Sequence, residues 1–159
     1  MSRICAIHPG LYGALAFFDV ERRTLERITD MPAAPRVHGK GFKVDPYRLA
    51  EAITSSVPYG GTVVIERVNA MPGQGVTSMF HFGESVGILQ GIAAVSGWRI
   101  EWVTPQAWKR HHGLIGKDKD VARTVAQERW PHLATFYFGR KKDVGRADAA
   151  LLGAFYLDR

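Results

Sequence analysis

The sequence of 159 residues contains a single cysteine, Cys5. One thiol excludes an internal disulfide and a zinc site built from cysteines, and it fits a reducing compartment such as the cytoplasm. No apolar run is long enough to span a membrane, and the N-terminus lacks the pattern of a secretory signal. Internal repeats, low-complexity tracts and linkers are also missing. We therefore expect one cytoplasmic domain, residues 1–159, with no membrane partner.

The chain has few acidic residues compared with its basic ones. The chain has 15 acidic against 21 basic residues, which gives a net charge of +6 and a pI near 9.7. Such a balance favours a polyanionic partner. Charge alone does not distinguish nucleic-acid-binding proteins from other basic domains, so the positions of the basic residues matter more.

The order of apolar runs predicts the fold class. Strands are expected at 3–7, 14–20, 25–30, 62–68 and 98–103, and helices at 46–57, 79–96, 104–112, 120–130 and 145–157. Asp45-Pro46 and Thr104-Pro105 have the residue types of an N-cap followed by the first helical position. This order predicts an α/β protein with a mixed five-stranded sheet and helices on both faces.

Three carboxylates stand in unusual positions. Glu66 ends an apolar strand, where a charge is costly unless it is paired or binds metal. Asp148 lies one turn into the last helix. Asp143 lies just before that helix, where an aspartate can also serve simply as the N-cap. If the first and fourth strands are neighbours, His8 and Glu66 meet near the strand ends. Oxygen ligands that converge from separate elements favour a site for two Mg²⁺ or Mn²⁺ ions. The alternative is that these carboxylates are structural, as buried helix caps and members of ion pairs.

Four segments carry a resemblance to a known family. They are AIHPGLYGALAFFD, VVIERVNAMPGQGVTSMFHFGESVGILQGI, WVTPQAWKRHHGL and KKDVGRADAALLGAFY. In this order they resemble the RuvC-type Holliday-junction resolvases, most of all the phage and organelle-like branch. The resemblance implies an RNase H-like fold and a homodimer in the cytoplasm of a bacterial or phage-infected cell. It also implies metal-dependent paired, symmetric nicking of four-way DNA junctions that leaves 5′-phosphate and 3′-hydroxyl ends.

The resemblance also assigns the site. Glu66, Asp143 and Asp148 match family acids. In the family, lysines near the places of Lys119 and Lys142 lie beside the scissile phosphate. His8 stands where the family has an aspartate in a DPG turn, and an imidazole brings no negative charge and cannot bridge two hard cations. The expected catalytic set is His8, Glu66, Asp143, Asp148 and Lys119, and its first four members are the expected metal ligands. We hypothesise that the chain binds junctions but cuts them poorly or not at all, and better with Mn²⁺ than with Mg²⁺.

Basic and apolar residues around this site predict DNA contacts. The expected contacts are Lys109, Arg110, Lys117, Lys119, Arg140, Lys141, Lys142, Arg146, Met79 and Phe80. A core role is the preferred reading for Phe82. The resemblance places the helix at 79–96 at the dimer interface.

Other functions are compatible with parts of the pattern. A non-catalytic junction-binding protein is the main alternative, because His8 removes a central acid. A ribonuclease H would share the fold and the metals. A sugar-kinase or actin-like ATPase has a similar phosphate turn, but the chain is too short for two lobes.

Overall fold

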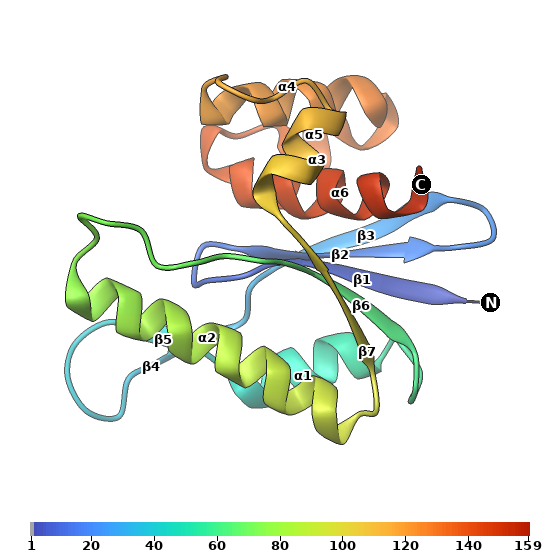
Figure 1. Cartoon of the computed structure of the whole chain (residues 1–159). Helices are drawn as coiled ribbons and strands as arrows, with labels where there is room; N and C mark the ends of the chain where they lie inside the picture. The colour runs from blue at the N-terminus through green and yellow to red at the C-terminus, as the bar shows by residue number, and fades with distance from the viewer. Residues whose placement is uncertain (1) are drawn as a thin grey trace.

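A mixed five-stranded sheet forms the centre of the computed structural model, which describes residues 2–159 (Figure 1). Its strand order is β3-β2-β1-β6-β7, with β1 antiparallel to β2 and parallel to β6. The strands are β1 (Arg3–His8), β2 (Ala14–Asp19), β3 (Thr24–Asp30), β6 (Thr62–Glu66) and β7 (Arg99–Val103). A separate hairpin pairs β4 (Ala33–Pro35) with β5 (Phe42–Val44).

The strand β6 shows why this sheet forms. Val63 and Ile65 belong to the core on one face, and Val64 belongs to the core on the other face. A strand buried on both faces requires a continuous apolar run, and the sequence TVVI provides one. Ile7 pairs with Ile65, so the next residues, His8 and Glu66, end adjacent parallel strands.

Helices cover both faces, as Figure 1 shows. The helices α1 and α2 pack on one face, and α3 to α6 lie on the other. Their bounds are α1 (Pro46–Thr54), α2 (Val76–Val95), α3 (Pro105–His111), α4 (Lys119–Arg129), α5 (Ala134–Phe138) and α6 (Val144–Leu157). Among residues 2–159, no helix is both long enough and apolar enough to cross a bilayer.

The helix α6 lies directly against the sheet. Ala147, Ala150 and Leu151 are fully buried on it, and a methyl group added at Gly153 would overlap the ring of Phe18 in β2. Small side chains allow this close approach. The packing brings the first turns of α6, including Asp148, to the end of β1.

The predicted fold class, a mixed five-stranded sheet with helices on both faces, is confirmed, with shifts at element ends. The helix predicted at 79–96 begins three residues earlier, at Val76. The hairpin β4–β5 and the short helix α5 were not predicted. Each spans only a few residues and shows little periodicity, so tertiary contacts decide its conformation.

Candidate functional site

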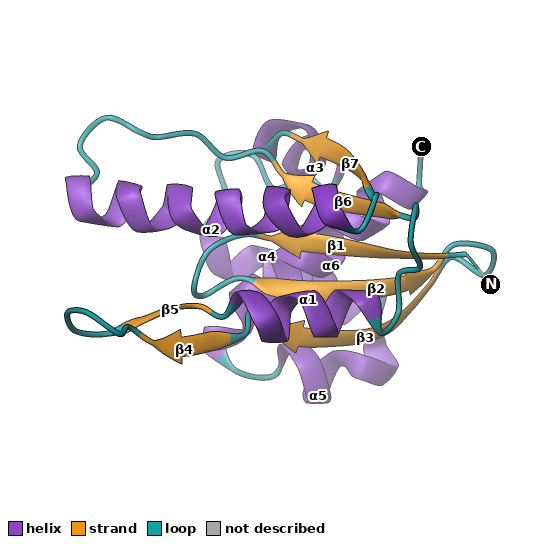
Figure 2. Cartoon of the chain, turned by 90° about the horizontal axis from the view of Figure 1, so that it is seen from below, coloured by secondary structure: helices purple, strands orange, loops and turns teal. Residues whose placement is uncertain are grey.

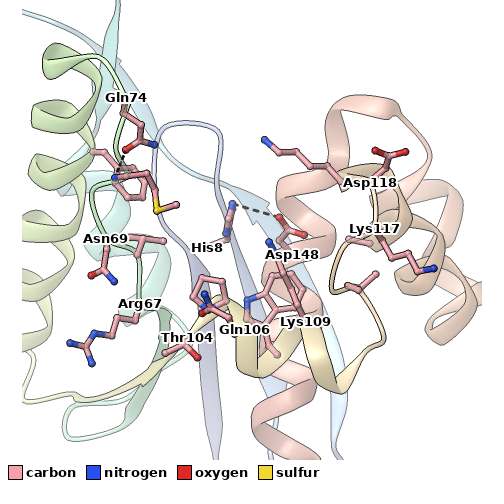
Figure 3. Close-up of a pocket in the computed structure, with 18 residues that line it drawn as sticks. His8, Arg67, Asn69, Gln74, Thr104, Gln106, Lys109, Lys117, Asp118 and Asp148 are labelled. Atoms are coloured by element: carbon pink, nitrogen blue, oxygen red, sulfur yellow. Dashed lines mark hydrogen bonds and ion pairs between the residues drawn. The ribbon is translucent and has the colours of Figure 1, made fainter.

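A cavity of about 530 Å³ opens beside the ends of β1 and β6. In Figure 3, His8 and Asp148 face each other between two walls. The loop that follows β6 provides Arg67, Asn69 and Gln74, and the opposite wall provides Lys109 and Lys117. The parallel pairing of β1 and β6 therefore places this polar cavity at the edge of the sheet where the sequence predicts a site.

The His8 ring stands between two carboxylates. Its Nδ1 lies 3.3 Å from Glu66 Oε1, and its Nε2 lies 3.7 Å from Asp148 Oδ2. The two ring nitrogens thus face different acids, which come from different elements. A protonated imidazole in this position interacts with both carboxylates.

Trp108 holds the second oxygen of Glu66. Its Nε1 donates a hydrogen bond of 2.6 Å to Glu66 Oε2, and both side chains are buried. Thr104 caps α3 and Pro105 starts it, which brings Trp108 beneath the cavity. Sequence reasoning missed this residue, although a tryptophan among polar neighbours in WKRHH is a signal for a buried side chain with a polar N–H.

The charges of the three groups are coupled. Burial lowers the pKa of His8, but the close contact with Glu66 and the charges of Glu66 and Asp148 outweigh it, so the net shift is upward. Burial raises the pKa of Glu66, and the contacts with His8 and Trp108 reverse this to a net lowering. Burial raises the pKa of Asp148 to about 6 despite the opposing charge of His8. Compared with a free imidazole and a free carboxyl group, the site therefore favours the charged forms of both His8 and Glu66.

Asp143 does not join this group. Its carboxylate accepts hydrogen bonds from the backbone N–H and the guanidinium of Arg140, at distances of 2.9–3.2 Å. Arg146 Nη1 lies 3.7 Å from the same carboxylate. Asp143 lines another cavity, beside Tyr12 and Asp30. The predicted grouping of Asp143 with the other three ligands is therefore absent in this structure, because nearby arginines hold the side chain.

The remaining donors do not fit a pair of Mg²⁺ ions. Such ions bind mainly carboxylate oxygens. A metal bound by His8 would need one ring nitrogen and both carboxylates directed at the same point. Here each nitrogen faces a different carboxylate. Across residues 2–159, no group of three or more His, Cys, Asp or Glu side chains is arranged to hold a metal ion.

The structure divides the predicted DNA-contact residues. Lys109, Lys117 and Lys119 line the cavity that contains His8. Arg140 and Lys142 line the cavity beside Tyr12, and Arg146 forms an ion pair with Asp30 at 2.7 Å. Arg110 and Lys141 are exposed and do not line the His8 cavity.

The apolar contacts predicted near the start of α2 lie on its first turns. Phe80 is exposed, and Met79 is half-buried beside a smaller pocket. Phe82, for which a core role was preferred, is half-buried and lines the His8 cavity. Asn69, Gln74 and Gln106 also line this cavity and were not predicted as site residues.

Solved structures share this fold. The chain aligns with Thermus thermophilus RuvC in complex with a Holliday junction substrate at a TM-score of 0.62 and 15% identity, covering 98% of this chain and 92% of that one. A second Thermus thermophilus RuvC structure gives a TM-score of 0.54 at 13% identity, covering 96% and 92%. This chain has the RuvC fold. No protein-family model and no curated protein sequence matches it.

A viral protein shows the same RuvC fold. The Fowlpox virus resolvase, solved with its substrate Holliday junction DNA, aligns at a TM-score of 0.53 and 15% identity, covering 93% of this chain and 95% of that one. The predicted resemblance to RuvC-type proteins is therefore confirmed at the level of the fold.

Proposed function

We propose that this protein binds four-way DNA junctions as a homodimer and that His8 keeps its own metal-dependent cleavage very slow. The position of the His8 ring between Glu66 and Asp148 carries the second part of the proposal. The first part is supported by the RuvC fold and by the junction DNA held in two of the similar structures. The main alternative, a junction-binding protein with no cleavage at all, differs only in the residual rate.

The chemistry of position 8 explains the slow cleavage. A nuclease that uses Mg²⁺ or Mn²⁺ concentrates negative charge where the cations bind. In this chain the net upward pKa shift favours a cationic His8 at that place, and the raised pKa of Asp148 weakens a second acid. His8 thus takes the position of a cation between the carboxylates and reduces their attraction for metal.

The wall opposite the loop after β6 supports phosphate binding. Lys109, Lys117 and Lys119 line it, and Lys109 Nζ lies 5.5 Å from the centre of the Trp108 ring. Lysines at such positions neutralise phosphates without reading base sequence. Lys119 also lowers the pKa of Asp148 through its charge, although burial prevails. We infer that Lys119 contacts the phosphate nearest to His8.

The outer face of α2 supports the homodimer. Gly83, Gly87 and Gly91 follow one another at intervals of four residues on the exposed side of the helix, and a methyl group added at any of them meets no atom within 4 Å. Val76 and Phe80 are also exposed on α2. Glycines at this spacing let two helices approach closely, so a second copy of the chain fits this face.

The first prediction concerns His8→Asp. We expect this variant to nick a labelled four-way junction in Mg²⁺ at least about 100-fold faster than the unmodified chain, because an aspartate restores a carboxylate ligand. The nicks should be symmetric, with 5′-phosphate and 3′-hydroxyl ends. Any residual cutting by the unmodified chain should be faster in Mn²⁺ than in Mg²⁺. Gel analysis of the labelled products measures the rates and the end groups.

His8→Asn is the matched control, because it removes the imidazole without adding a carboxylate, and it should stay slow. A thermal melt gives a second readout: 10 mM Mg²⁺ should raise the Tm of His8→Asp by about 3–6 °C and leave the unmodified chain unchanged. Equally fast cutting by the unmodified chain and His8→Asp in Mg²⁺ would contradict the role of His8. Failure of both proteins to prefer a junction over a linear duplex would contradict the proposed substrate.

A further inference from the structure

Tyr12 is the most exposed large hydrophobic side chain among residues 2–159. It lies in the turn between β1 and β2, four residues after His8, and 91% of its surface is accessible. This turn lies on the same edge of the molecule as the loop after β6 and the hairpin β4–β5 (Figures 1 and 2). An aromatic ring gains much from burial, so a ring presented to solvent at this edge fits a contact made with a ligand.

The turn that carries Tyr12 is held tightly. Gly10 has a φ of +101°, and the Gly13 N–H donates a hydrogen bond of 3.0 Å to the Gly10 carbonyl. An added methyl group at Gly13 would overlap the His8 carbonyl, and one at Gly145 in α6 would overlap the Tyr12 carbonyl. The backbone of Tyr12 is therefore packed between the site and α6 while its ring projects outward.

Two cavities flank the ring, and basic side chains line both. One of about 290 Å³ contains Lys43 and Arg36, and the other, of about 240 Å³, contains Lys142 and Arg140. Arg36 pairs with Glu84 and Arg140 pairs with Asp143. Lys43 and Lys142 take part in no ion pair within residues 2–159, so no acidic side chain there neutralises either charge.

This arrangement continues the DNA surface beyond the His8 cavity. Phe82 lines both that cavity and the one beside Lys43, and its ring lies against Gly10. A strand that leaves the His8 cavity over Phe82 therefore meets Tyr12 next. The acidic groups at this surface, Asp143 and Asp30, are each paired with an arginine, so the net charge favours a polyanion over an acidic protein.

We propose that Tyr12 stacks on an unstacked DNA base while Lys43 and Lys142 contact the phosphates on either side of that nucleotide. This inference rests on the proposed function, because a four-way junction supplies such a base where pairs open at its centre. Paired bases inside a linear duplex hide their faces, so a ring in this position distinguishes the junction from its arms. Base–aromatic stacking of this kind tolerates any base sequence.

The test compares Tyr12→Ala, Tyr12→Phe and Tyr59→Ala on two probes. The probes are a four-way junction with 2-aminopurine next to the branch point and a single-stranded oligonucleotide with the same base. Tyr59 is a matched control, because it is 83% exposed and lies before β6, at the other end of the strands. Fluorescence anisotropy measures affinity, and 2-aminopurine emission reports stacking.

We expect Tyr12→Ala to bind both probes about tenfold more weakly and to lose the quenching of 2-aminopurine. Tyr12→Phe should bind within about twofold of the unmodified chain, because it keeps the ring, and Tyr59→Ala should match the unmodified chain. Unchanged affinity and quenching in Tyr12→Ala would overturn the inference while junction selectivity of the unmodified chain still supports the proposed function. Stacking on the single strand without junction selectivity would support the stacking role of Tyr12 and contradict the proposed function.

Discussion

At the scale of single residues, His8 changes how the buried acids are stabilised. Glu66 is only 4% exposed, and a carboxylate that deep needs compensation. Trp108 provides it through a hydrogen bond and His8 through its charge. Asp148 has less support, since its contact with His8 is longer, at 3.7 Å. The site thus contains one well-satisfied acid and one acid that resists ionisation.

Asp148→Asn tests this difference. A pKa of about 6 in the folded chain, above the ordinary value of 3.8, means that ionising Asp148 lowers stability as the pH rises from about 4 to about 6, and that the loss is complete above this range. His8 acts in the same direction, because its upward pKa shift stabilises the fold at low pH, and this gain is lost as the pH rises through its folded pKa. At pH 8 without divalent metal, Asp148→Asn should therefore increase the free energy of unfolding by about 2 kcal/mol. At pH 4 the difference should nearly vanish. Urea titrations at both pH values measure it, and a variant less stable than the unmodified chain at pH 8 would contradict the assignment.

At the scale of elements, α2 differs from the other helices because apolar residues occur all around it. Leu89 and Ala93 pack on the sheet, while Val76, Phe80 and Val95 are exposed on the same helix. A helix with apolar residues on every side is usually covered on every side. The glycines at 83, 87 and 91 lie within the exposed part of α2, which is the face proposed for the second copy.

Two substitutions at Gly87 distinguish an effect on dimer formation from an effect on folding. Gly87→Ala adds one methyl group that meets no atom within the single chain, so it should favour the isolated helix by about 1 kcal/mol. Because alanine is still small enough for two helices to approach, this variant should weaken the dimer only slightly. Gly87→Glu adds a charged side chain to the proposed interface and should yield a folded monomer. Sedimentation velocity measures the mass, and circular dichroism checks the fold. Dimers of equal stability in both variants would place the interface elsewhere.

At the scale of the whole molecule, basic residues lie at both ends of the strands, but the cavity that contains His8 and Asp148 lies at one end. Lys109, Lys117 and Lys119 surround the ends of β1 and β6. Arg22, Arg23 and Arg99 lie at the other end, where β1 and β6 begin. In the sheet register, Arg3 at the start of β1 lies opposite Asp19 at the end of β2, and Arg99 at the start of β7 lies opposite Thr62 at the start of β6. If net charge alone drives DNA binding, both ends should contribute equally.

Two triple variants distinguish position from charge. Replacing Lys109, Lys117 and Lys119 with glutamine lowers the net charge from +6 to +3, and so does replacing Arg22, Arg23 and Arg99. For junction DNA, the slope of log affinity against log salt should become less negative by about 2–3 in the lysine variant, because each phosphate contact contributes about −0.9. The arginine variant should keep nearly the full slope. Equal losses in both variants would show that the cavity makes no dedicated phosphate contacts.

The sequence alone determined the features that depend on near neighbours along the chain. The apolar run before Glu66 predicts a strand covered on both faces, and Asp45-Pro46 predicts the start of α1, where the Asp45 side chain accepts from two backbone N–H groups. The sequence also predicted a mixed five-stranded sheet, but the adjacency of its first and fourth strands entered only as a condition, which the structure fulfils. The meeting of His8 with Glu66 then required only that their parallel strands pair.

Only the tertiary structure decided which partners the site residues take. Asp143 was expected beside the other acids, but Arg140 and Arg146 hold its carboxylate. Trp108 reaches Glu66 from 42 positions away, and Tyr12 projects because α6 packs against its backbone. Such contacts depend on how helices dock on the sheet. Residue spacing within a segment describes only the local backbone, so it contains no information about these distant partners.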